Sequence, residues 1–308
     1  MSTGPIRFSI QIPGTADVAG WLDKVRQAED LGFFSLSVPD HLSPELPQLA
    51  PLVALTAAAS VTSRLRLAIT VLNNDFRHPA MLAKEIATLD RFSDGRIDVG
   101  LGSGWLASDY SSSGVRSFDP APVRVGRLEE SLTLLRELLS GGEVTFQGDH
   151  YQVTRFTSYP MPAQARVPIM VGGAGRRMLR IAARHADIVS IVVNNPTVDS
   201  SIKAFEERVG WITEAVPSDR SEPVLGLRIV MGVVAANAAS ARSAAEQMAS
   251  RRGVSVDALL DSPFVVVGEL PAVKDRLLQL HEQFGVSYFT LSEDFAWQLG
   301  DLIAELSS

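Results

Sequence analysis

Residues 64–105 read RLRLAITVLNNDFRHPAMLAKEIATLDRFSDGRIDVGLGSGW. Leu65–Leu72 is rich in Leu, Ile and Val and predicts a strand, and Ile97–Leu101 predicts a second one. Between them, Pro79 suits the first turn of a helix, and apolar residues then recur at i, i+4 and i+7. Polar or glycine-rich residues follow each strand. The stretch therefore predicts a parallel βαβ unit, whose strand ends are where α/β enzymes bind ligands.

The same alternation of strand and helix runs through most of the chain. Core strands are expected near residues 6, 34, 66, 97, 168, 188, 225 and 288. Eight strands with intervening helices favour a closed (β/α)8 TIM barrel of the α/β class over an open, doubly wound sheet. One domain is expected over residues 1–308, because no linker or repeat divides the chain.

Three segments interrupt the βα rhythm. Glu143–Val153 predicts a small hairpin around Gly148-Asp149. Insertion segments are expected after strand 4, where Ser108–Pro122 has no clear periodicity, and after strand 8, beyond Ser292. Such segments would shape a substrate pocket, so the sequence does not identify the substrate.

Composition limits the class of protein. The chain has 308 residues, 46% of them hydrophobic, a formal net charge of −7 and no cysteine. An acidic chain has no basic field to attract nucleic acid, and without cysteine it can form neither disulfides nor thiolate metal sites. No apolar run is long enough to cross a membrane, and the N-terminal residues lack a signal-peptide pattern. We therefore expect a soluble, cytoplasmic protein.

Two motifs carry candidate chemistry. Asp40-His41 follows the second predicted strand and could transfer a proton or contact a planar cofactor, although Asp beside Pro also favours a simple turn. Gly172-Gly173-Ala174-Gly175-Arg176-Arg177 follows the fifth strand and opens a helix. Glycines and free N–H groups at a helix start suit a phosphate, whereas the alternative is a glycine-rich turn with solvated arginines.

The chain resembles the bacterial luciferase-like family, and within it the branch that uses the deazaflavin coenzyme F420. The resemblance rests on Asp40-His41, on VLNNDFRHP at residues 71–79, on the SDGR turn followed by GLGSGW at residues 93–105, and on VGGAGRR at residues 171–177. It extends through most of the chain and implies a TIM barrel that forms a homodimer.

The resemblance also implies site residues. His41 and Asp40 would act in catalysis, with His41 as proton donor or acceptor and Asp40 orienting it or contacting the cofactor ring. The Thr70–Val71 bond would be a cis peptide in a bulge that supports the ring. The residues implied to bind the cofactor are Asp40, Thr70, Val71, Ser108, Gly172, Gly173, Ala174, Gly175, Arg176, Arg177, Ile191 and Val192.

The implied reaction is hydride transfer between the deazaflavin C5 and a small organic substrate bearing a C=C, C=N, carbonyl or alcohol group. An FMN-dependent monooxygenase is the main alternative, because both cofactors use this scaffold. Two others remain open: a metal-dependent sugar-phosphate enzyme using Asp40, His41 and Glu293, and a non-catalytic cofactor-binding relative. The preferred hypothesis needs no metal.

Overall fold

The computed structural model describes residues 4–14, 17–193 and 199–307 and contains a closed parallel barrel. Neighbouring strands follow the order β3-β2-β1-β13-β10-β9-β8-β5, and pairing of β3 with β5 closes the ring. The barrel strands are β1 (Arg7–Gln11), β2 (Ser35–Val38), β3 (Arg66–Ile69), β5 (Ile97–Gly102), β8 (Ile169–Gly173), β9 (Ile188–Ile191), β10 (Val224–Ile229) and β13 (Val286–Ser292). The predicted barrel and its eight strands are confirmed.

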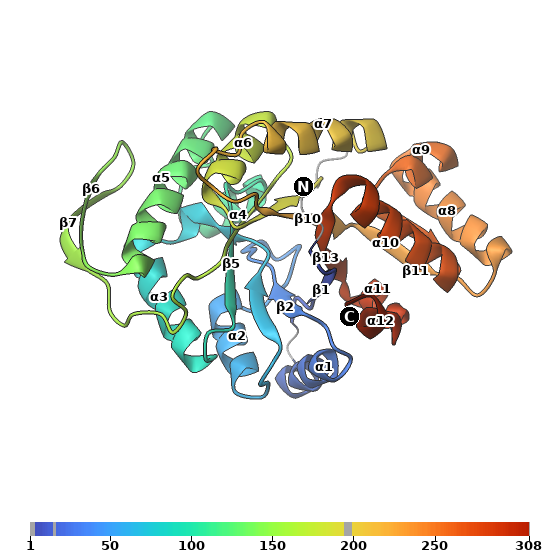
Figure 1. Cartoon of the computed structure of the whole chain (residues 1–308), viewed down its shortest axis with the longest axis horizontal. Coiled ribbons are helices and arrows are strands. Elements are labelled where there is room, and N and C mark those ends of the chain that lie inside the picture. The colour runs from blue at the N-terminus through green and yellow to red at the C-terminus, as the bar shows by residue number, and fades with distance from the viewer. Residues whose placement is uncertain (1–3, 15–16, 194–198, 308) are drawn as a thin grey trace.

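Helices surround the barrel (Figure 1). Those between successive strands are α1 (Val18–Asp30), α2 (Pro51–Ala59), α3 (Pro79–Phe92), α5 (Ala121–Ser140), α6 (Arg176–His185), α7 (Ile202–Thr213) and α10 (Leu270–Phe284). The predicted helix after Pro79 is confirmed as α3, which begins at that proline and buries Leu82, Ile86 and Leu89. Among the described residues, no helix is both long and apolar enough to cross a membrane.

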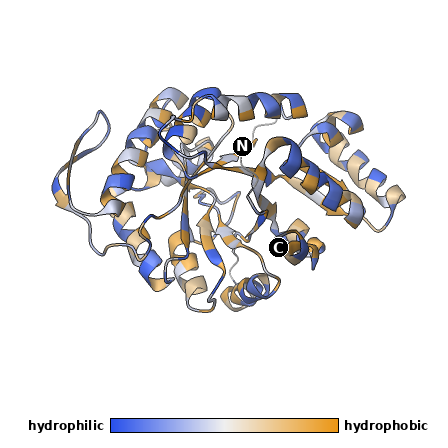
Figure 2. Ribbon diagram, in the orientation of Figure 1, coloured by the Kyte–Doolittle hydropathy of each residue, from blue (hydrophilic) through white to orange (hydrophobic). Residues whose placement is uncertain are grey.

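The apolar side chains of the barrel strands form two distinct layers. The larger lies between the strands and the helices and includes Phe8, Leu36 and Leu67, each fully buried. A smaller cluster of Met170, Ile188 and Tyr288 lies apart from it. These residues alternate along their strands with those of the larger layer, so they face the barrel interior. Figure 2 shows largely hydrophobic barrel strands surrounded by helices of mixed hydropathy.

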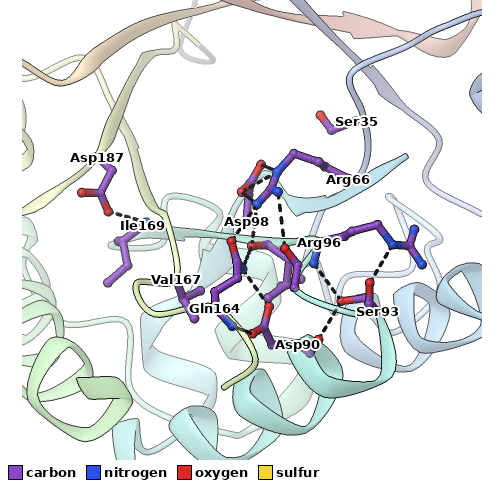
Figure 3. Close-up of polar contacts among 12 residues, drawn as sticks. Ser35, Arg66, Asp90, Ser93, Arg96, Asp98, Gln164, Val167, Ile169 and Asp187 are labelled. Carbon is purple, nitrogen blue, oxygen red and sulfur yellow. Dashed lines mark hydrogen bonds and ion pairs between the residues drawn. The ribbon is translucent and has the colours of Figure 1, made fainter. Parts of the chain in front are cut away.

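The amino ends of the strands are joined by polar contacts (Figure 3). The Arg66 guanidinium binds both carboxylate oxygens of Asp98, with Nη2 2.5 Å from Oδ1. Asp90 accepts from the backbone N–H and the side-chain amide of Gln164. Asp187 accepts from the Ile169 N–H at 2.9 Å and pairs with Arg136. These bonds pair the charged side chains at the amino end of the barrel, which we call its floor.

The hairpin is confirmed, and its strands are β6 (Glu143–Gln147) and β7 (Gln152–Thr157), antiparallel to each other. Figure 1 shows it projecting beside α5 on the outside of the barrel. Glu130 on α5 accepts the backbone N–H groups of Asp149, His150 and Tyr151 and so holds the turn against that helix.

The insertions differ from the prediction in two places. Ser108–Pro122 is not wholly irregular, because α4 (Ala107–Ser113) forms there. The other large insertion follows the seventh strand rather than the eighth. It comprises β11 (Met231–Val234), α8 (Ala238–Arg252), α9 (Val256–Asp261) and β12 (Val265–Gly268), and β11 pairs with β12 outside the barrel.

After the eighth strand the chain forms only the short helices α11 (Glu293–Leu299) and α12 (Leu302–Ser307). The sequence prediction failed here because Val224–Val233, apolar apart from Arg228 and its glycines, predicts one continuous strand. In the structure this run leaves the barrel after Ile229 and continues as a strand of the second sheet. Hydropathy alone cannot mark such a change of sheet.

Candidate active site at the carboxyl end of the barrel

A bulge interrupts the third barrel strand at Thr70 and Val71. The strand stops at Ile69 and resumes as β4 (Leu72–Asn73), which pairs with the end of β5. The Thr70–Val71 peptide bond is cis, as the resemblance implies. The bulge is therefore present where the cofactor ring is expected.

Three glycines leave room for the Val71 side chain. A Cβ added to Gly102 would lie 2.6 Å from Val71 Cγ2, and one added to Gly172 would lie 3.2 Å from Val71 Cγ1. A Cβ on Gly100 would overlap the Ile69 carbonyl oxygen and contact Val71. The alternate glycines of GLGSG in β5 thus make room for the bulge, a role that the sequence prediction missed. Gly172 also begins the glycine-rich loop, so bulge and loop adjoin.

Asp40 is buried at the end of β2 and binds neighbours from the third βα connection. Its Oδ2 accepts from the Asn73 N–H at 3.2 Å and from Arg77 Nη1 at 2.8 Å. Burial raises the pKa of Asp40 above the ordinary aspartate value, although Arg77 and the Asn73 N–H act in the opposite direction. These bonds hold Asp40 in place beside the bulge.

His41 is oriented by Asp109, which the sequence prediction missed. His41 Nδ1 lies 2.7 Å from Asp109 Oδ2, while Oδ1 accepts the backbone N–H groups of Leu42 and Ser43, each at 2.8 Å. Of the two roles predicted for Asp40, orienting His41 does not match the structure, since the hydrogen bonds of Asp40 go to Asn73 and Arg77. Contact with the cofactor ring stays a prediction. A lone acid in a serine-rich stretch gave no signal, because the contact spans 68 residues.

An ionised carboxylate only accepts hydrogen bonds, so the His41 tautomer that satisfies the Asp109 contact carries its proton on Nδ1 and leaves Nε2 as an acceptor. The Trp105 ring stands edge-on to the imidazole, with 5.8 Å between ring centroids, and is half exposed. His41 thus has a fixed ring orientation beside an exposed aromatic surface.

The glycine-rich loop and the start of α6 form the second part of the candidate site. No side chain caps α6, whose N-cap is Gly175, and a Cβ added there would meet nothing within 4 Å. Arg176 lies over the Trp211 ring, and Arg177 Nη1 donates to the Pro122 carbonyl at 3.1 Å. The amino end of α6 is therefore open to an anion, with two arginines beside it.

The remaining predicted cofactor residues fall in different places. Ser108 lies next to Asp109, and its Oγ is buried without a hydrogen-bond partner in the described part of the chain. Val192 approaches Gly172, whose added Cβ would lie 3.9 Å from Val192 Cγ2. The Ile191 side chain is fully buried in the layer between strands and helices, so the structure does not bring it to the site.

Residues after the third strand support this end of the barrel. Arg127 of α5 binds both Asp75 oxygens, at 2.8 and 2.9 Å, and His78 Nδ1 accepts the Ala80 N–H at the start of α3. Tyr110 donates to Asn73 and Asp75, and burial raises its pKa to about 12. These contacts are architectural.

The metal-dependent alternative requires Asp40, His41 and Glu293 to converge. In residues 4–14, 17–193 and 199–307, no group of three or more His, Asp or Glu side chains is placed to hold a metal ion. Glu293 instead pairs with Lys24, Nζ to Oε1 being 2.5 Å. The three residues do not form the ligand set that this alternative needs.

Comparison with known proteins places this geometry in a family. The model of the luciferase-like monooxygenase family matches residues 5–264. The chain belongs to this family. A relative, the F420-dependent glucose-6-phosphate dehydrogenase of Nakamurella multipartita, is 34% identical over 198 residues, which make up 61% of this chain and 56% of the dehydrogenase.

Solved structures share the fold of this luciferase-like protein. The coenzyme F420-dependent tetrahydromethanopterin reductase of Methanopyrus kandleri has a TM-score of 0.79, with 20% identity, over 99% of this chain and 100% of the reductase. A monooxygenase from Streptomyces bottropensis has a TM-score of 0.78, with 22% identity, over 97% of this chain and 98% of the monooxygenase. At these identities the likeness establishes the barrel fold alone.

Proposed function

We propose that this luciferase-like protein is an oxidoreductase that binds coenzyme F420 at the carboxyl end of its barrel and transfers hydride to or from a small organic substrate. The observation that carries the proposal is the junction at Gly172. There the cis bulge at Thr70–Val71 adjoins the loop that leads to the uncapped end of α6. One continuous surface thus offers a support for a planar ring and a site for a phosphate.

The F420-dependent dehydrogenase named above, 34% identical to this chain over 198 residues, supports the choice of F420. When bound, the deazaflavin supplies hydride chemistry at C5, toward a C=C, C=N or carbonyl group or from an alcohol. The chain's own residues supply position and proton transfer. The Thr70–Val71 bulge supports the ring, the N–H groups at the start of α6 bind phosphate with Arg176 and Arg177 beside them, and Ser108 and Val192 line the site.

His41 is the proton carrier in this proposal. Asp109 holds its Nδ1 and leaves Nε2 to give a proton to the substrate, or to take one from it, at the face next to Trp105. Asp40 contacts the ring from a buried position that Arg77 and Asn73 fix. We further propose that the chain acts as one domain in a cytoplasmic homodimer.

Equilibrium titration with F420 and, separately, with FMN tests the proposal, with cofactor fluorescence as the signal. We expect F420 to bind more tightly than FMN. Preferential FMN binding would contradict the proposal and indicate the monooxygenase alternative. Oligomeric state can be measured on the same samples by light scattering, where a monomer would contradict the homodimer.

Two substitutions at Gly175 make the titration specific to the loop. Its φ of −80° is accessible to any residue and its Cβ would face open space, so neither G175D nor G175A should disturb the fold. G175D places a carboxylate where the phosphate is expected and should weaken F420 at least tenfold, whereas G175A should not. Equal affinity in both variants would remove the phosphate assignment.

A further inference from the structure

Arg228 is a charged residue in an otherwise apolar barrel strand, the next-to-last residue of the segment VLGLRI. Its Nη2 donates to Gln11 Oε1 at 2.7 Å. The amide of Gln11 in turn donates to Thr70 Oγ1 at 2.9 Å and to the Thr70 carbonyl at 3.3 Å. The chain Arg228–Gln11–Thr70 therefore crosses the barrel and ends at the bulge of the candidate site.

No carboxylate compensates the charge of Arg228 within the described ranges. Arg66, Arg77 and Arg127 are also partly or fully buried, and each forms an ion pair with an aspartate. Burial lowers the pKa of Arg228, and no nearby acid opposes this. One hydrogen bond to a neutral amide leaves most of the guanidinium donors free for another acceptor.

A second polar group beside Arg228 also lacks a partner. Thr290 of β13 pairs in register with Arg228, so both side chains project from the same face of the sheet. Thr290 is 2% exposed, and its Oγ1 has no hydrogen-bond partner among the residues that the structure describes. Buried hydroxyls are nearly always hydrogen-bonded in folded proteins. A half-buried cation and a buried hydroxyl thus lie side by side with unused hydrogen-bonding capacity.

We propose that Arg228 and Thr290 bind the anionic group, a carboxylate or a phosphate, of a small molecule held at the carboxyl end of the barrel. A guanidinium offers paired N–H donors that match the oxygens of either group. This site is separate from the loop at Gly172–Arg177, because β10 and β8 are not neighbours and β9 lies between them. The inference rests on the proposed function only in taking this end of the barrel as the reaction site.

Two molecules can supply the anion, the substrate and the cofactor. The test uses phenyl phosphate and benzoate as probes, titrated calorimetrically into wild-type protein with and without saturating F420. The variants are R228M and, as a matched control, R155M, because Arg155 is exposed and pairs with Glu143 at the surface hairpin. F420 affinity is measured for all three proteins.

If the substrate supplies the anion, at least one probe binds F420-loaded wild type and R155M, and R228M weakens it at least tenfold without changing F420 affinity. If the cofactor supplies it, R228M weakens F420 itself at least tenfold. Either result supports the inference. R228M with unchanged affinity for F420 and for both probes would overturn it.

The G175D variant separates this inference from the proposed function. It blocks the anion site of the loop, so a probe that still binds G175D and is lost in the G175D/R228M double variant binds at Arg228 even if F420 never binds. Probe binding that survives in the double variant would contradict the Arg228 site, whatever the cofactor.

Discussion

The two ends of the barrel contain the same kinds of polar and charged side chain, but these side chains have different partners. At the amino ends of the strands, Arg66 binds Asp98 through bidentate contacts (Figure 3), and Asp187 pairs with Arg136. At the carboxyl ends, Asp40 and Asp75 are paired with arginines as well, but Arg228 has only an amide acceptor. Thr290 Oγ1 and Ser108 Oγ there have no partner in the described part of the chain. The difference indicates where a ligand binds. Polar groups that are paired with each other stabilise the fold, whereas polar groups without a partner can form hydrogen bonds with a ligand.

The largest expected effect on stability comes from removing an ion pair at the amino end of the barrel. R66M leaves the Asp98 carboxylate buried without its cation and should lower the free energy of unfolding by about 3–5 kcal/mol. R228M removes a charge that has no ion-pair partner in the described ranges and leaves only the neutral Gln11 amide oxygen without its donor, so it should cost less, about 1–3 kcal/mol. Urea unfolding of both variants measures this difference, and equal losses would contradict the comparison.

Removing Asp109 should have the next largest effect. D109A deletes the acceptor of two backbone N–H groups and of His41, and should cost about 2–3 kcal/mol in urea unfolding. D109N keeps a carbonyl oxygen for the backbone and turns its NH2 group toward His41 Nδ1. We therefore expect the neutral imidazole to move its proton to Nε2, which ¹⁵N NMR of the ring reports. An unchanged tautomer in D109N would remove Asp109 as the orienting group.

The close packing around the bulge predicts a smaller loss of stability in G102A, and V71A should restore part of that stability. G102A brings a Cβ to within 2.6 Å of Val71 Cγ2 and should destabilise the protein by about 1–3 kcal/mol. The double variant G102A/V71A removes the conflicting methyl group and should recover part of that loss. G100A is the control, because its Cβ conflicts with the Ile69 backbone and V71A should not rescue it. Equal rescue of both glycine variants, measured by thermal unfolding, would show that Val71 is not the cause.

The smallest effect is on the pH dependence of stability at the paired end. The Ile169 N–H and Arg136 outweigh burial and lower the pKa of Asp187 in the folded protein. The ionised group therefore stabilises the fold above the ordinary aspartate pKa, and this contribution is lost as the pH falls toward the lowered value. D187N should reduce the loss of stability on acidification. Parallel wild-type and D187N curves of unfolding free energy against pH, below about pH 5, would contradict the shift.

The sequence predicted those features that arise from local patterns. Apolar runs and helical spacing gave the eight strands and α3, and the family resemblance located the bulge at Thr70–Val71. Contacts distant in the sequence carried no such signal, which is why Asp109 and the roles of Gly100 and Gly102 were missed. The sequence does show Arg228 as a charge inside an apolar strand. It does not show the hydrogen-bond partner of Arg228, because Gln11 is 217 residues away.

A crystal structure of the protein with F420 bound tests the central claim most directly. The account predicts density for the deazaflavin ring against Thr70–Val71, with His41 at its edge and the phosphate at the start of α6. Ring density away from the bulge, or phosphate density away from residues 172–177, would contradict it.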